Sequence, residues 1–159
     1  MDNHEECVGK RTTAMTGRLK GNNHRLEARV YYADTDFSGV VYHARYLEFM
    51  ERGRIEYLRL VGEQLSGDDD SHVDSRLAWI VRRLQVHFRR PARIDELITI
   101  ETRTTNISGA RVEMAQTIWR GGDVLIEAQV ECALVDSLGH PQRLPKHWKD
   151  TLLRQNDRS

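Results

Sequence analysis

The chain has 159 residues, a length that suits one domain with its own hydrophobic core. Its 24 basic and 24 acidic side chains give a formal net charge of zero, so charge does not point to nucleic acid or to an anionic membrane. Two cysteines are too few for a disulfide framework or a thiolate zinc site, and no apolar run approaches the ~18 residues of a transmembrane helix. The N-terminus lacks the basic-then-apolar order of a secretory signal, so we expect a cytoplasmic protein.

The start of the chain is polar and shows no hydrophobic period. We expect residues 1–24 to be a disordered extension ahead of a single domain over residues 25–155. A first strand is predicted at residues 26–32. The acidic turn Asp34-Thr35-Asp36 follows it, and Ser38-Gly39 lets the chain bend before an apolar segment, residues 40–42, that we expect to be buried.

A long helix is predicted from about His43 until glycines and an acidic run break the pattern at residues 62–75. We interpret Asp68-Asp69-Asp70 as a solvated loop rather than a cation site. Leu47, Ile55 and Leu58 widen the apolar face of the helix, so we expect the rest of the fold to wrap around it. The main apolar stripe consists of Tyr46, Phe49, Met50, Gly53, Tyr57, Leu60 and Val61.

From residue 78 onward the hydrophobic period is two. Four predicted strands are separated by turn signals at Pro91-Ala92-Arg93, at residues 106–109 and at Gly121-Gly122-Asp123. Successive strands with short turns predict an antiparallel meander with one apolar face. A loop at residues 136–145 and a terminal helix at 146–155 complete the chain. One long helix against a curled antiparallel sheet of five or six strands is the α+β hot-dog fold.

Asp34-x-Asp36 is open to three chemical interpretations. A phosphotransferase nucleophile would need parallel strands and intervening helices, which the pattern does not offer. A metal site of Asp34, Asp36 and His43 lacks further ligands, so we expect no metal. In the third, a carboxylate lies beside a helix N-terminus, whose unpaired N–H groups stabilise an oxyanion while the carboxylate attacks a carbonyl or activates water. Simple capping of the turn and the helix remains the alternative.

The string D-T-D-x-x-G-V-V-Y-H at residues 34–43, with residues 46–52, resembles the signature of the 4-hydroxybenzoyl-CoA thioesterase family. The resemblance is greatest to its YbgC branch of acyl-CoA thioesterases associated with the Tol–Pal gene cluster, and it spans about residues 27–150. It implies a hot-dog fold that dimerises through its sheets, commonly into tetramers, and hydrolyses acyl-CoA without a cofactor. Further matches are Val81-Arg82-Arg83, Pro91-Ala92-Arg93 with Asp95, and Arg143-Leu144-Pro145.

The resemblance also implies roles for single residues. Asp36 is expected to be the nucleophile or general base, and the backbone N–H of His43 to face the thioester oxygen, while Asp34 shapes the turn. Glu51 either lies near the acyl pocket or pairs with a nearby arginine. Arg82 interrupts the apolar face of its strand, which indicates a groove or a subunit interface. The predicted substrate-binding residues, including arginines for the CoA phosphates, are Gly39, Val40, Tyr42, Glu51, Arg82 and Arg93.

Two other functions fit the same fold. A dehydratase or hydratase needs a histidine–acid pair acting on the acyl chain, and no such downstream site is present in the sequence. A non-catalytic module that binds acyl-CoA or acyl carrier protein remains the alternative, because fold does not dictate function. Pure binding needs no carboxylate beside the thioester, so Asp36 favours an acyl-CoA thioesterase that binds acyl-CoA and further copies of itself.

Overall fold

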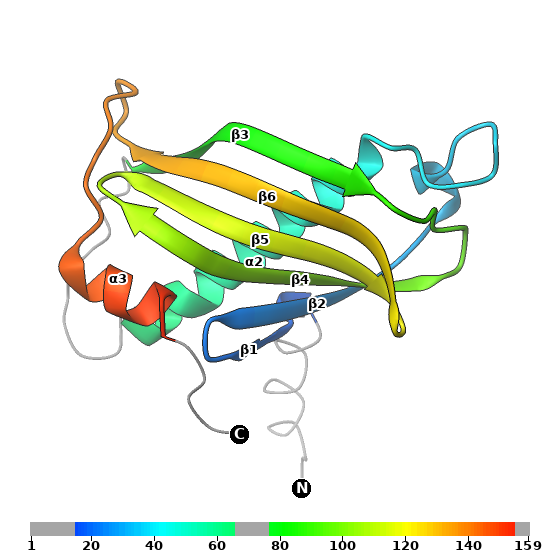
Figure 1. Cartoon of the computed structure of the whole chain (residues 1–159), viewed down its shortest axis with the longest axis horizontal. Coiled ribbons are helices and arrows are strands. Elements are labelled where there is room, and N and C mark those ends of the chain that lie inside the picture. The colour runs from blue at the N-terminus through cyan, green and yellow to red at the C-terminus, as the bar shows by residue number, and fades with distance from the viewer. Residues whose placement is uncertain (1–14, 66–76, 155–159) are drawn as a thin grey trace, which may run out of the picture.

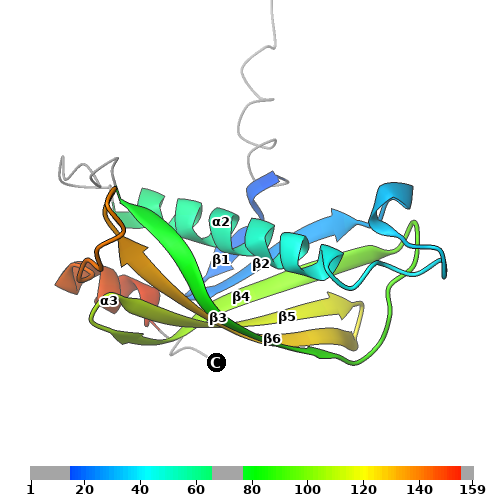
Figure 2. The ribbon, with the colours of Figure 1, turned by 90° about the horizontal axis from the view of Figure 1, so that it is seen from above.

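The computed structural model describes residues 15–65 and 77–154. A long helix, α2 (Arg45–Leu65), lies along one face of a curved antiparallel sheet with the strand order β1-β2-β4-β5-β6-β3 (Figures 1 and 2). This arrangement confirms the predicted α+β hot-dog fold. The strands are β1 (Arg18–Lys20), β2 (Asn23–Arg29), β3 (Ala78–Phe88), β4 (Leu97–Ser108), β5 (Arg111–Arg120) and β6 (Asp123–Val135), and the short helices are η1 (Tyr32–Asp34) and α3 (Lys146–Leu152).

The core lies between α2 and the sheet. The predicted apolar stripe of α2 is almost wholly buried there, with Met50 and Tyr57 fully covered, because its helical spacing keeps these side chains on one face. Alternate residues of the strands cover the other side, including Ile98 and Ile100 of β4 and Ile118 of β5. The helix and the strands each place their apolar residues on one face, and these faces therefore meet in one hydrophobic layer.

Polar groups cross this core beneath the middle of α2. Gln116 Nε2 donates to the carbonyl oxygen of Met50 at 2.9 Å and to Thr102 Oγ1 at 2.8 Å, and Gln116 Oε1 accepts from Arg54 at 3.0 Å. The hydroxyls of Tyr57 and Thr104 are hydrogen-bonded at 2.8 Å. Because buried polar groups are stable only when paired, these bonds hold the helix in one register on the sheet.

The curled sheet covers one side of α2, and part of the widened apolar face of the helix stays exposed in the single chain. Leu47 is 37% exposed and Ile55 is 47% exposed, because the sheet contacts α2 from one side only (Figure 2). The apolar face of the helix is thus wider than the surface that this chain supplies to cover it.

The predicted four-strand meander is also wrong in one position. Strand β3 pairs with β6, from Ala78 opposite Val135 to Phe88 opposite Ile126, and only β4, β5 and β6 follow one another in the sheet. Main-chain hydrogen bonds between Val30 and residues 95–96 hold the start of β4 beside the end of β2. As a result β3 becomes an edge strand on the far side of the sheet.

Several boundaries differ from the predictions. The predicted strand at residues 26–32 ends at Arg29, because the carboxylate of Asp34 accepts a hydrogen bond from the N–H of Tyr31 and draws the chain into η1. The predicted disordered extension contains β1 and the start of β2, which form a hairpin by main-chain pairing at a polar sheet edge. Gly21, with φ of +63°, makes the turn that polar composition did not reveal.

Other elements differ by a few residues. Helix α2 begins at Arg45, two residues after the predicted start, and continues past Gly62 to Leu65. Strand β4 continues through the predicted turn at residues 106–109 as far as Ser108, and α3 ends at Leu152. The acidic run at residues 68–70 lies outside the described residues.

Candidate active site

The acidic turn forms a hairpin, here called the aspartate loop (residues 35–41), at one end of the molecule (Figure 1). Thr35 and Val41 form a bridge, Asp36 N–H donates to the carbonyl oxygen of Val40 at 2.9 Å, and Gly39 N–H donates to that of Asp36 at 3.0 Å. Gly39 has φ of +79°, the left-handed conformation that closes a three-residue hairpin loop. The loop therefore holds Asp36 at a defined point.

The Asp36 carboxylate is exposed and hydrogen-bonded within the loop. Its Oδ1 accepts from the N–H of Ser38 at 2.8 Å and from the Ser38 hydroxyl. These bonds lower the pKa of Asp36 below its ordinary value, and the nearby charge of His43 adds to the effect. Asp36 is consequently ionised at neutral pH, the form that both a nucleophile and a general base require.

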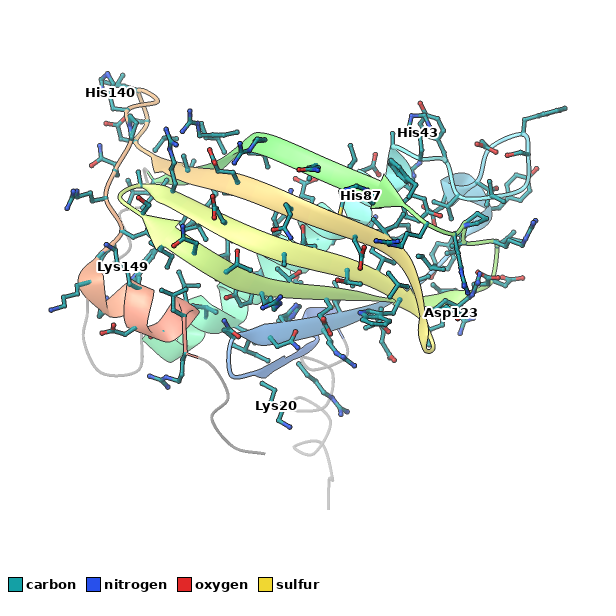
Figure 3. All side chains as sticks on the ribbon, in the orientation of Figure 1. Lys20, His43, His87, Asp123, His140 and Lys149 are labelled. Atoms are coloured by element: carbon teal, nitrogen blue, oxygen red, sulfur yellow. The ribbon has the colours of Figure 1, made fainter. Side chains whose placement is uncertain are left out.

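The start of α2 offers unpaired N–H groups next to this loop. Arg45 N–H bonds to the carbonyl oxygen of Tyr42 at 2.8 Å, and Leu47 N–H to that of Ala44 at 3.1 Å. The N–H groups of His43 and Ala44 meet no acceptor in the part of the chain that the structure describes. Figure 3 shows His43 at the aspartate-loop end of the molecule. Donors of this kind bind anions and oxyanions.

Asp34 ties the loop to the helix. Its Oδ2 accepts from Tyr31 N–H at 2.8 Å, its Oδ1 lies 3.5 Å from Arg45 Nε, and its carbonyl oxygen accepts from Tyr42 N–H at 2.9 Å. Arg45 also donates to the carbonyl oxygen of Ala33 at 3.1 Å. Since both carboxylate oxygens of Asp34 are engaged, it shapes the turn, as expected, and Asp36 is the carboxylate available for chemistry.

A second loop supports the first. Val41 N–H donates to the carbonyl oxygen of Ala92 at 2.9 Å, and Val40 bridges to Arg93. The buried hydroxyl of Tyr46 accepts from Ala92 N–H at 2.9 Å. The sequence marked Tyr46 only as a core residue, since a helical period does not show that its hydroxyl reaches another segment.

Arg93 differs from the arginines around it. Arg89 is paired with Glu127, Arg90 with Asp123, and Arg120 with Glu96. The Arg93 guanidinium has no hydrogen bond or ion pair with any residue that the structure describes, although its backbone N–H donates to Glu96. Its charge acts on Glu96 only at longer range, so the residue places an exposed guanidinium without a direct partner among the described residues beside the aspartate loop.

Aromatic rings form a wall next to the helix start. The rings of Tyr42 and His43 lie 4.6 Å apart, and His43 meets Phe88 edge-on at 6.3 Å. Phe88 is 52% exposed and also lies 6.0 Å from the ring of Tyr46. Of the segment expected to be buried, only Val41 is, because Tyr42 turns outward into this wall. The sequence predicted Phe88 as a strand residue only, since nothing local shows that β3 ends beside the helix start.

Two predicted site residues make no hydrogen bond or ion pair with Asp36 in the part of the chain that the structure describes. Glu51 is exposed on α2 and makes no ion pair with a described residue. Arg82 is the extra residue of a β-bulge between Val81 and Arg83, and its Nη1 lies 3.6 Å from Glu131. Six residues of strand separate Arg82 from Phe88, a span of roughly 20 Å. A single chain therefore does not bring Arg82 to the aspartate loop.

Neither a metal site nor a membrane span is found among residues 15–65 and 77–154. No group of three or more His, Cys, Asp or Glu side chains there could hold a metal ion, so Asp34, Asp36 and His43 are not arranged as ligands. None of the described helices combines the length and apolar character needed to cross a bilayer.

The profile of the thioesterase superfamily matches residues 38–127, which is more than half of the chain. The chain belongs to the thioesterase superfamily. This thioesterase is 38% identical over 130 residues to the acyl-CoA thioesterase YbgC of Haemophilus influenzae, with 80% of this chain and 93% of that protein covered. The resemblance to the 4-hydroxybenzoyl-CoA thioesterase family and its YbgC branch is thus confirmed.

Solved structures agree with the fold. A probable thioesterase from Bartonella henselae is 49% identical, with a TM-score of 0.65, and the match covers 78% of this chain and 99% of that one. A 4-hydroxybenzoyl CoA thioesterase complexed with 4-hydroxybenzoyl CoA has a TM-score of 0.70 at 15% identity, over 82% of this chain and 99% of the other. At that identity the likeness shows a shared hot-dog fold and nothing more.

Proposed function

We propose that this protein hydrolyses the thioester bond of an acyl-CoA, with Asp36 as nucleophile or general base and the backbone N–H of His43 as oxyanion donor. The observation that carries the proposal is the pairing of an exposed, ionised carboxylate with unpaired N–H groups at a helix start. The 38% identity to a protein named acyl-CoA thioesterase supports the substrate class.

Both roles of Asp36 give the same products. As a nucleophile, Asp36 adds to the thioester carbon, the C–S bond breaks, and the CoA thiolate leaves and takes up a proton; water then hydrolyses the acyl–aspartyl anhydride. As a general base, Asp36 takes a proton from water while the water oxygen adds to the same carbon, and that proton passes to the departing thiolate. Each route consumes one water and places negative charge on the carbonyl oxygen, which the N–H of His43 stabilises.

The surroundings of the loop suit the rest of the substrate. A Cβ at Gly39 would meet no described atom within 4 Å, so Gly39 leaves room beside the reacting carboxylate, and Val40 follows it in the loop. The rings of Tyr42 and Phe88 offer an apolar surface for the acyl group. The unpaired guanidinium of Arg93 binds a CoA phosphate, for which a planar, permanent cation is well suited.

A second copy of the chain completes the assembly. Edge strand β3 exposes Ile80 (45%), Val81 (48%) and Phe88 (52%), and a long apolar edge of this kind is unusual for a monomer. Antiparallel pairing of two β3 edges along their full length places Arg82 of one copy opposite Leu84 of the other, about 13 Å of strand from its Phe88 instead of the roughly 20 Å within one chain. This is the arrangement in which Arg82 and Glu51 serve as substrate-binding residues. Sedimentation or light scattering of the purified protein gives a dimer or a larger assembly; a monomer contradicts this part of the proposal.

The catalytic test is the release of free thiol from a panel of short, long and aromatic acyl-CoAs by the wild type and by Asp36→Asn. We expect the variant to lose ~100-fold or more in kcat on any substrate that the wild type turns over. Asp136→Asn is the matched control, because the partly exposed Asp136 closes a similar loop and accepts main-chain hydrogen bonds from Leu138 and His140. Figure 3 shows His140 at the end of the molecule opposite to His43.

Three outcomes are informative. Loss of activity in Asp36→Asn alone supports the proposal, and the panel then identifies the acyl class. Equal activity of Asp36→Asn and the wild type refutes a catalytic role for Asp36. If no acyl-CoA is cleaved but one binds, the protein is a non-catalytic acyl-CoA or acyl-carrier-protein module.

A further inference from the structure

The two carboxylate oxygens of Asp36 have different surroundings. Oδ1 accepts both from the N–H and from the hydroxyl of Ser38. Oδ2 has no hydrogen-bond donor within the described residues. Rotation about the Cβ–Cγ bond of Asp36 would break two charge-assisted hydrogen bonds at once, so the carboxylate has one preferred orientation and presents Oδ2 outward.

A second loop of the chain, closed by Asp136 and His140, can be compared with the aspartate loop to see what the Ser38 hydroxyl adds. Asp136 N–H donates to the carbonyl oxygen of His140 at 3.0 Å, Gly139 N–H donates to that of Asp136 at 3.0 Å, and Gly139 has φ of +83°. Leu138 N–H donates to Asp136 Oδ1 at 2.9 Å, just as Ser38 N–H does to Asp36. The Asp136 loop thus shares these three bonds with leucine in place of serine, and His140 N–H, at 2.9 Å, is the second donor to Oδ1 there. The turn therefore forms without a hydroxyl, and in the Asp36 loop the Ser38 hydroxyl supplies the second donor to Oδ1.

We infer that Ser38 is a positioning residue for the hydrolysis: its hydroxyl and N–H hold Oδ1 of Asp36 so that Oδ2 is the oxygen that meets the thioester carbon or the attacking water. This inference rests on the proposed function of Asp36. In either route the bond-making lone pair comes from Oδ2, and Oδ1 stays bound to Ser38 throughout. Small errors in the placement of a reacting group are costly to rate, which is why a second contact to Oδ1 matters.

The same hydrogen bonds affect ionisation. They are the largest cause of the lowered pKa of Asp36, so they keep the carboxylate charged as the pH falls. Removing the hydroxyl therefore has two separable effects: a freer carboxylate, which lowers kcat, and a higher pKa, which moves the acid limb of the rate profile to higher pH.

The experiment compares Ser38→Ala, which keeps the N–H and loses the hydroxyl, with Ser38→Thr, which keeps both. We expect Ser38→Ala to lower kcat by roughly 10-fold with KM within about twofold of the wild type, and Ser38→Thr to restore most of the rate. The acid limb moves to higher pH in Ser38→Ala only, and an NMR titration of the Asp36 carboxyl follows the same shift without reference to activity. Thr35→Val is the matched control, because the Thr35 hydroxyl, at the first residue of the same loop, donates to the carbonyl oxygen of Tyr32 in η1 and makes no hydrogen bond to Asp36.

The results separate this inference from the proposed function. If Asp36→Asn loses activity while Ser38→Ala matches the wild type in both kcat and acid limb, the role of Ser38 is refuted and the proposed function stands. If Ser38→Ala and Thr35→Val lose rate equally with no movement of the acid limb, the hydroxyl acts only on the stability of the hairpin, which also refutes the inference. If the wild type hydrolyses no acyl-CoA, the proposed function and the role of Ser38 are both refuted.

Discussion

The packing of Gly53 of α2 against the sheet gives a sharp test of how the fold is packed. A Cβ atom added at Gly53 would lie 2.6 Å from Ile100 Cγ2, 3.0 Å from Thr102 Oγ1 and 3.3 Å from Gln116 Nε2. Ordinary contacts between carbon atoms are ~3.5–4.0 Å, so Gly53→Ala forces the helix away from β4 or displaces the side chains beneath it. Gly53 is therefore required by close packing rather than by its backbone conformation.

Two opposing effects determine how much Gly53→Ala changes the free energy of unfolding. Alanine is about 1 kcal/mol better than glycine in a helix interior, which favours the variant. Overpacking a filled core costs typically ~1–3 kcal/mol, and a weakened Gln116 bond to the carbonyl oxygen of Met50 adds ~1 kcal/mol. We expect Gly53→Ala to lower the free energy of unfolding by about 2 kcal/mol, which is a fall in Tm of roughly 6 °C for a chain of this size.

The assay is urea unfolding followed by circular dichroism at a fixed protein concentration, with thermal melts in parallel. Gly62→Ala is the matched control in the same helix, because a Cβ at Gly62 meets no atom of residues 15–65 or 77–154 within 4 Å. We expect that variant to be as stable as the wild type or more stable by up to about 1 kcal/mol. If Gly53→Ala is as stable as Gly62→Ala, the helix does not lie this close to the sheet and the packing argument fails.

Three further predictions concern single contacts. Tyr46→Phe leaves the N–H of Ala92 buried without its acceptor, and we expect urea unfolding to show a loss of ~1–3 kcal/mol; an unchanged midpoint would contradict that bond. Burial lowers the pKa of His24 below 6.5, so the unfolded chain binds its proton first and the wild type loses stability as the pH falls below that value. His24→Asn has a smaller loss of unfolding free energy between about pH 7.5 and pH 5.5, and equal losses in the two proteins would rule out His24 as the source. Gly39→Ala places a side chain at φ of +79°, which costs ~1–2 kcal/mol and lowers kcat by disturbing Asp36. Gly122→Ala, where a Cβ meets no described atom within 4 Å and φ is not positive, changes neither stability nor kcat.

Much of the candidate site could be recognised in the sequence because its parts are local. Asp36, Gly39 and His43 lie within eight residues, and a strand end, a turn and a helix start suffice to put a carboxylate near unpaired N–H groups. The roles of the two aspartates separate only in the structure. Asp34 is engaged by Tyr31 and Arg45, whereas Asp36 keeps one oxygen without a donor among the described residues.

Contacts between distant segments could not be read in this way. Three kinds of contact depend on segments more than 20 residues apart: the hydroxyl of Tyr46 on the N–H of Ala92, the ring of Phe88 against His43, and the ion pairs of Arg89, Arg90 and Arg120. Arg82 shows the opposite case. The sequence grouped it with the site, but β3 carries it to the other half of the sheet.

The amino-acid sequence by itself determined the kinds of element, the face that each one buries and the family, because hydrophobic period and a local motif are properties of neighbouring residues. Only the tertiary structure decided that β3 pairs with β6, that β1 extends the sheet, and that one side of α2 stays open. The physical reason is that strands pair through main-chain N–H and C=O groups, which nearly every residue carries alike. The choice of partner strand therefore depends on how the whole chain closes around its core.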